Sequence, residues 1–263
     1  MTQVPEVAGI LHQNRHREAF AEVFGGDYMN RFTDPVVFRE VTFYSPPVSQ
    51  EYRQNFKVLS RNLFAETVYR RRKGFSEEIL NHYVSVSGAK LDAIQRLITN
   101  NRDRLRELAL GNGIEIDAGY LHCKQQLVPV IHSHIMQFLR ILQLFDELLQ
   151  ITGSCTLHGM LSPEDRKKVE VQCRAAIRSF SGTIRNESTK MRKEAQRIAA
   201  EIGGDTELAD TIQAQAEAEA HADAQLEADR TGLTVPEGAD PVAMVANAKA
   251  AANAAKSTVS AVG

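Results

Sequence analysis

The sequence predicts a mainly α-helical protein with a few short β-strands. Apolar residues recur at helical spacing over residues 76–112 and again over 133–152. The segment 36–45 is rich in β-branched and aromatic residues, and 120–129 alternates between polar and apolar side chains. A chain of 263 residues with 43% apolar content can bury a substantial core in one or two domains.

Composition gives expectations about the environment of the protein. The sequence has no run of about 18 apolar residues and no apolar export segment near its start, so we expect a cytoplasmic protein without membrane insertion. Its cysteines, Cys123, Cys155 and Cys173, are widely spaced and odd in number, which argues against a disulfide framework. Reduced thiols are expected.

Charge is distributed unevenly along the chain. From Glu201 onward there are eleven acidic residues against three basic ones, whereas the preceding residues carry 28 basic and 22 acidic side chains. A basic body with an acidic tail is common in proteins that bind polyanions such as nucleic acids. Binding of Lys and Arg to phosphate groups releases counterions, which favours the complex. A solvated surface with a solubilising tail is the alternative explanation.

The sequence of the N-terminal part predicts an arm, then a strand, then a helix. Residues 1–35 form the arm, with a short helix from Arg15 to Val23. The strand at 36–45 has two mixed faces, which suits a strand covered on both sides, and it ends before Pro46. The next helix is expected from Ser49 to about Arg72.

A basic run, Arg71, Arg72 and Lys73, closes that helix before Gly74. Basic residues in a last turn complement the helix dipole, and a DNA phosphate contact is the functional alternative. Ser76 then caps a long helix that ends at Gly111. Its apolar stripe is expected to pack within its own domain, with a dimer seam as the alternative.

The segment Tyr120 to about Ser181 has the order strand, helix, link and helix. Leu121, Cys123 and Leu127 alternate with three polar residues along the strand. The following helix, Ser133 to about Thr152, is apolar around most of its circumference and must be enclosed by protein, which a small chain often achieves by pairing with a second copy. Gly153 and Ser154 begin the link to the last helix.

This order is that of a ribbon-helix-helix element, in which two chains pair their strands and insert the ribbon into the DNA major groove. The polar residues His122, Lys124 and Gln126 are the candidate base-reading side chains, because Lys can donate to guanine and Gln can bond adenine in bidentate fashion. An ordinary sheet edge with a solvated face is the alternative. The predicted fold class is mainly α with short β-strands, comprising a ribbon-helix-helix-like dimeric DNA-binding core and additional long helices.

The last helix of this unit begins at Ser162, which is followed by Pro163, and is expected to reach about Ile202. Free N–H groups at such a start can hold a DNA phosphate. The candidate phosphate contacts here are Ser162, Arg166, Lys167 and Lys168. Two carboxylates in the first turn, Glu164 and Asp165, oppose that role, so the cap is a better signal of a helix than of an anion site.

Composition divides the chain into four regions: the arm at 1–35, a strand plus helical domain at 36–112, the ribbon-helix-helix-like region for DNA binding and dimerisation at 113–202, and a tail at 203–263. The tail is rich in Ala and acidic residues and has little apolar surface to bury, so a flexible segment is expected.

The chain resembles the AcaB-like transcriptional activators of conjugative plasmids and related proteins of integrating conjugative elements. The resemblance lies in the sequence IEIDAGYLHCKQQLVPV, in the apolar helix that follows it, and in the sequence HGMLSPEDRKKVEVQCRAAIRSF. The resemblance spans roughly residues 36 to 200 and is better after 113. It implies a dimeric ribbon-helix-helix DNA-binding protein that acts in the bacterial cytoplasm and activates transfer genes. The expected partners are double-stranded operator DNA with an inverted repeat, a second copy of the chain, and RNA polymerase.

Other chemistry has little support in the sequence. There is no phosphate loop, dinucleotide fingerprint, hydrolase elbow or zinc-protease motif, so an enzyme and a cofactor are not expected. His122, Cys123, His132 and His134 lie close in sequence but lack the spacing of a zinc finger, so no metal site is expected. The rival hypothesis to DNA binding is a helical scaffold or adaptor of the conjugation machinery.

Overall fold

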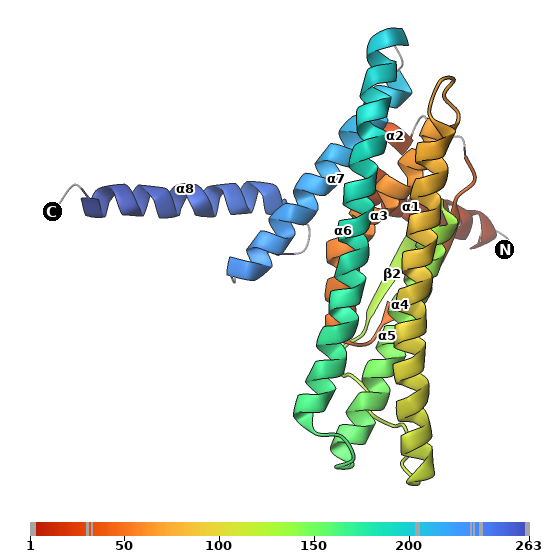
Figure 1. Cartoon of the computed structure of the whole chain (residues 1–263), viewed down its shortest axis with the longest axis vertical. Coiled ribbons are helices and arrows are strands. Elements are labelled where there is room, and N and C mark those ends of the chain that lie inside the picture. Colours follow the sequence, from red (N-terminus) through yellow and green to blue (C-terminus); the bar gives the residue numbers. More distant parts are fainter. Residues whose placement is uncertain are drawn as a thin grey trace.

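In the computed structural model the described residues are 4–29, 32, 34–202, 206–231, 233, 235–236 and 239–260. They form long helices around one short two-stranded sheet (Figure 1). In chain order the elements are α1 (Val4–Phe24), α2 (Gly26–Met29), β1 (Val37–Phe43), α3 (Pro46–Arg70), α4 (Glu77–Gly111), β2 (Lys124–Val130), α5 (Ser133–Leu157), α6 (Pro163–Ile202), α7 (Thr206–Thr231) and α8 (Pro241–Ser260). The expected mainly α-helical fold with short strands is confirmed.

Helix α5 forms the centre of a bundle made with α3, α4 and α6. Its buried side chains lie on most sides of the helix and include Ile135, Phe138, Leu142, Phe145 and Leu149. The prediction that protein must enclose this helix is therefore confirmed. The enclosing helices come from the same chain, so α5 does not need a second copy to be covered.

The two strands pair antiparallel within the chain, with Val37 opposite Val130 and Phe43 opposite Lys124. The predicted pairing of two 120–129 segments from different chains is not seen, because β1 takes the place of the second copy along β2. The aromatic and β-branched side chains of β1 suit this role, since cross-strand pairs of such residues stabilise a sheet. The expected order of strand, helix and helix is present in β2, α5 and α6, and the two-stranded sheet is made inside one chain.

Hydrogen bonds to Asp146 of α5 fix the corner between β1 and α3. The backbone N–H groups of Tyr44 and Ser45 donate to its carboxylate at 2.7 and 2.8 Å, and the Ser45 hydroxyl also donates to it. Pro46 and Pro47 begin α3 instead of preceding it, because proline lacks an N–H that the first turn leaves unpaired anyway. The helix starts earlier than Ser49 for that reason.

Helix α5 also runs past its predicted end at Thr152 and includes Gly153 and Ser154. A Cβ atom at Gly153 would lie 3.3 Å from that of Ala118, so the small residue lets the segment after α4 cross the helix closely. The Ser154 hydroxyl accepts a hydrogen bond from the Ala118 N–H at 2.9 Å. These two residues serve packing here and do not interrupt the helix.

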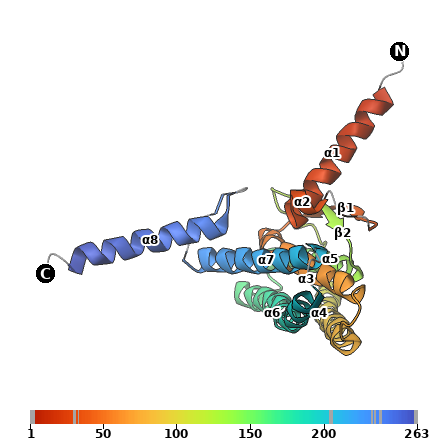
Figure 2. The same ribbon diagram turned by 90° about the horizontal axis from the view of Figure 1, so that it is seen from above.

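The C-terminal region differs from the flexible tail that its composition predicts. Helix α7 packs against α3, and Thr211, Ala224 and Ala228 are buried in it. Small side chains bring helix backbones close, so an alanine-rich helix can dock without large apolar residues. Helix α8 packs on α7 and, like the start of α1, projects away from the bundle (Figure 2).

The predicted arm is likewise helical over most of its length, and Phe20, Val23 and Phe24 of α1 enter the core. Cys155 and Cys173 are buried, Cys123 is exposed, and all three are free thiols. In the described part of the chain, no helix combines the length and the apolar character that crossing a membrane requires.

Candidate nucleic-acid interface

Lys124 and Gln126 lie at the start of β2, on the face of the sheet that turns toward the core. Residues opposite each other on paired strands share a face, and Gln126 lies opposite the buried Val41. Further along β2 the same face carries Val128, which is fully buried. Lys124 and Gln126 are therefore half-buried at the rim of the core, whereas the sequence predicted them on the free face.

The residues before β2 form an irregular segment, because the strand starts at Lys124 and not at Tyr120. Leu121 is 97% exposed and Cys123 is also exposed, so the expected alternation does not place these two side chains in the core. His122 lies in the same segment with its side chain in solvent. Of the three predicted base-reading residues it is the most accessible.

This segment lies beside the start of α6. The Arg166 guanidinium hydrogen-bonds the Tyr120 hydroxyl, and burial raises the pKa of Tyr120 although the positive charge of Arg166 acts in the opposite direction. Lys167 and Lys168 are exposed in the next positions. The fold thus brings His122 into the neighbourhood of the predicted phosphate contacts at the start of α6.

The first turn of α6 is capped by its own side chains. The Asp165 N–H donates to the Ser162 hydroxyl oxygen at 3.0 Å, and that hydroxyl donates to the Asp165 carboxylate at 2.9 Å. The Lys168 ammonium lies 2.8 Å from the same carboxylate. These hydrogen bonds, first from Lys168 and then from Ser162, lower the pKa of Asp165. A carboxylate therefore already occupies the region where a phosphate would meet the helix start.

The second group of predicted phosphate contacts lies at the opposite end of the bundle. The turn that holds Arg71, Arg72 and Lys73 joins α3 to α4, while the start of α6 lies beyond the far ends of α4 and α5 (Figure 1). The 25 residues of α5 alone correspond to about 37 Å. The Arg71 guanidinium also pairs with Asp34 at 2.6 Å. The two basic groups do not form one patch.

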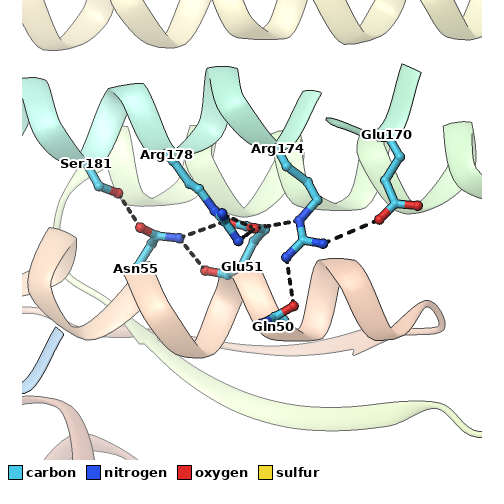
Figure 3. A network of polar contacts seen from close by, with 7 residues as sticks. All are labelled: Gln50, Glu51, Asn55, Glu170, Arg174, Arg178 and Ser181. Carbon is cyan, nitrogen blue, oxygen red and sulfur yellow. Dashed lines mark hydrogen bonds and ion pairs between the residues drawn. The ribbon is translucent and has the colours of Figure 1, made fainter. Parts of the chain in front are cut away.

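A buried polar network between α3 and α6 was not predicted from the sequence (Figure 3). Glu51 has no exposed side-chain surface, and its carboxylate accepts from Arg174 Nε at 2.9 Å and from Arg178 Nε at 3.0 Å. Neither arginine was among the residues that the sequence singled out. Their spacing of four residues, matched by Glu51 and Asn55 on α3, was the available signal, since residues four apart share a helix face.

The network continues on both sides of Glu51. Arg174 also donates to the Gln50 side chain at 2.7 Å, Asn55 donates to Glu51 at 3.2 Å, and the Ser181 hydroxyl donates to Asn55 at 2.5 Å. Every partner lies on α3 or α6, so the network fixes the helix that follows β1 against the helix that carries the phosphate candidates.

No metal centre is found among the residues that the structure describes, since they contain no cluster of three or more His, Cys, Asp or Glu side chains in suitable positions. His132 and His134 of the histidine-rich segment face each other, with ring centroids 4.9 Å apart. The His132 Nε2 lies 3.7 Å from the Glu66 carboxylate.

These features define a helical bundle with one short antiparallel two-stranded ribbon. A comparison with solved structures finds the same fold in AcaB from uropathogenic E. coli, known from a crystal structure of the selenomethionine-containing protein. The TM-score is 0.59 at 20% sequence identity, and the match covers 68% of this chain and 98% of that one. No family model and no curated protein matches the sequence. The chain therefore has an AcaB-like fold.

Proposed function

We propose that the protein is a sequence-specific DNA-binding regulator that activates conjugative transfer genes in the cytoplasm. The observation that carries the proposal is the AcaB-like fold, in which Tyr120, shortly before β2, lies beside Arg166 in the first turns of α6. The sequence resemblance to AcaB-like activators supports the same function over residues 36 to 200.

DNA would meet the protein at the open end of the ribbon. His122 and Lys167 are exposed, and Lys124 and Gln126, which follow His122 in the chain, are half-buried. Lysine and glutamine can read guanine and adenine edges, and each good contact contributes about 1–3 kcal/mol of discrimination. Because Glu164 and Asp165 repel phosphate, the backbone contacts would come from Lys167 and Lys168 and not from the helix start itself.

A homodimer would lengthen the DNA-binding surface, because it would contain two copies of the proposed site. In a two-stranded sheet each strand has one edge that no strand covers, and two copies arranged about a dyad would present two equivalent ribbon ends to DNA. The operator would then be an inverted repeat. Activation would require a further contact with RNA polymerase.

Selection from a library of random duplexes, followed by affinity measurements on the enriched site, tests the proposal. We expect an inverted repeat, and we expect the double variant Lys124→Ala with Gln126→Ala to weaken binding at least tenfold. Lys193→Ala, an exposed lysine near the other end of α6, is the matched control and should leave affinity unchanged. If no sequence is enriched, DNA reading is excluded; if the double variant binds normally with an intact fold, the site assignment is wrong.

Exposed apolar side chains favour a second candidate, a scaffold or adaptor of the conjugation machinery. Leu110 at the end of α4 is 63% exposed and Leu157 at the end of α5 is 79% exposed, with Met160 in the link that follows. Such side chains can bind a protein partner. Salt dependence separates the candidates, because affinity of a DNA reader for its site falls steeply as salt rises, whereas a scaffold binds little duplex at physiological ionic strength.

A further inference from the structure

A cavity of about 500 Å³ lies between β2, α1, α3, α7 and the segment that joins α7 to α8. Small-molecule sites in proteins usually measure about 300–1,000 Å³. The cavity is lined by Lys124 and Gln126 from the strand, by Lys57 from α3 and by His221 from α7. Segments far apart in the sequence thus build one hollow of the size of a small organic molecule.

One side of the cavity is apolar and aromatic. Tyr52 and Phe56 of α3 are stacked, with ring centroids 4.8 Å apart, and both rings are otherwise buried. Leu127 of β2 and Pro236, in the segment between α7 and α8, extend the same lining. This side offers a surface for an apolar or aromatic group of a ligand.

Basic side chains of α3, next to the aromatic ones, also line the cavity. Arg53 and Lys57 lie one turn apart on α3, and within the described residues no hydrogen bond or ion pair engages either of them. Burial, together with the charge of Arg61, lowers the pKa of Lys57, although Glu22, Glu217 and Asp240 act in the opposite direction. An anion in the cavity would stabilise the charged form of this lysine.

We propose that this cavity binds a small organic anion, in which a phosphate or carboxylate head contacts Arg53 and Lys57 and an apolar or aromatic group lies against Tyr52 and Phe56. The two carboxylates in the lining, Glu22 and Asp240, leave the cavity with more positive than negative side chains when Arg53, Lys57 and Lys124 are counted. The assignment does not depend on the proposed DNA binding.

Fluorescence titration of the full-length protein with anilinonaphthalene sulfonate, an aromatic anion, tests this site. We expect one saturable site per chain, and we expect Lys57→Met to weaken it at least tenfold because the charge is lost while most of the side-chain stem remains. Lys57→Arg should retain binding, and Lys193→Met on the exposed face of α6 is the matched control. Circular dichroism verifies that each variant is folded. Absence of a saturable site, or equal binding by Lys57→Met and Lys193→Met, would overturn the proposal.

Displacement of the dye identifies the head group. Adenosine monophosphate represents an aromatic phosphate and octanoate an apolar carboxylate, while adenosine lacks the anion. We expect one of the two anions to displace the dye and adenosine to leave it bound. Displacement by adenosine alone, or by none of the three, would contradict an anion site.

Because Lys124 and Gln126 line the cavity, a bound anion would also alter affinity for the operator; this step alone rests on the proposed function. If the dye binds as expected but no duplex is ever selected, the DNA assignment fails and the anion site stands. If a duplex is selected but the dye finds no saturable site, the anion site fails and the DNA assignment stands.

Discussion

Helices α5 and α7 have nearly the same length, 25 and 26 residues, but they are held in different ways. Helix α5 buries large apolar side chains on most of its faces within the bundle. In α7 the buried residues that the structure describes, Thr211, Ala224 and Ala228, are small, and the helix is held by polar contacts, among them Arg61 Nη1 donating to the Ala214 carbonyl at 2.9 Å. Both segments form helices readily. The comparison therefore teaches that packing, and not helix propensity, distinguishes the stable bundle of α3 to α6, called the body below, from the attached helix α7.

Truncating the centre of the body should have the largest effect. Phe145→Ala removes a fully buried ring from α5, and the cavity that results should cost about 3–5 kcal/mol of unfolding free energy. Urea denaturation measures this loss. Gln213→Ala, an exposed position of α7, is the matched change and should stay within about 0.5 kcal/mol. Similar losses for the two variants would remove the distinction between the helices.

Breaking the α3–α6 network should have the next largest effect. Glu51→Ala leaves Arg174, which is 22% exposed, and Arg178 without their buried counter-charge, and we expect a loss of about 3 kcal/mol. The comparison variant is Glu201→Ala at the end of α6, where the carboxylate pairs with Arg197 but is 61% exposed. That pair should contribute less than about 1 kcal/mol. A Glu51→Ala protein as stable as Glu201→Ala would show that the network does not hold the helices together.

Releasing α7 should have a smaller effect on the body. Arg61 is buried and donates both to the Val23 carbonyl and to the Ala214 carbonyl, and it pairs with Glu217, so Arg61→Leu removes one contact with α1 and two with α7. Buried hydrogen bonds from a charged donor contribute about 1.5–3 kcal/mol each, so we expect limited proteolysis to cut within 206–231 first, while α3 to α6 stay intact. Simultaneous cleavage of α5 and α7 would mean that the two form one cooperative unit.

Acid should weaken the body slightly through Glu66. Burial favours the neutral acid, but the interactions with His132, whose Nε2 lies 3.7 Å from the carboxylate, and with Arg70 outweigh it and hold the pKa of Glu66 below its ordinary value of 4.5. The ionised form therefore stabilises the fold above that pH, and this contribution declines as the pH falls through the lowered pKa. The stability difference between wild type and Glu66→Gln should shrink on acidification from pH 7 to pH 3. A difference that stays constant over this range would exclude the ion pair as its source.

The sequence predicted those features that depend on local patterns. The long helices follow from apolar periodicity, and the Ser76 and Ser162 caps were found because a capping hydroxyl has a local signature. The pairing of β1 with β2 could not be read, because it joins segments separated by about 80 residues. The face of Lys124 and Gln126 was assigned wrongly for a related reason. Alternation along a strand determines which residues share a face, but tertiary packing decides which of the two faces is buried.

The candidate site was predicted only in part. His122 and the start of α6 are brought together by the crossing of the segment after α4, which depends on the contact of Gly153 with Ala118 and has no sequence signature. Arg71 to Lys73 were grouped with the other basic residues only by charge, and charge does not report that a helix separates them. The docking of α7 was missed because alanine gives a weak apolar signal, although its small size permits close contact.

The pairing of β1 with β2 has a consequence for synthesis on the ribosome. At about 5–20 residues per second, β1 emerges roughly 4–16 s before β2 becomes available to pair with it. During that interval the aromatic and branched side chains of Val37–Phe43 have no strand partner in the nascent chain. Chaperones that recognise extended apolar segments would therefore meet this protein first at β1.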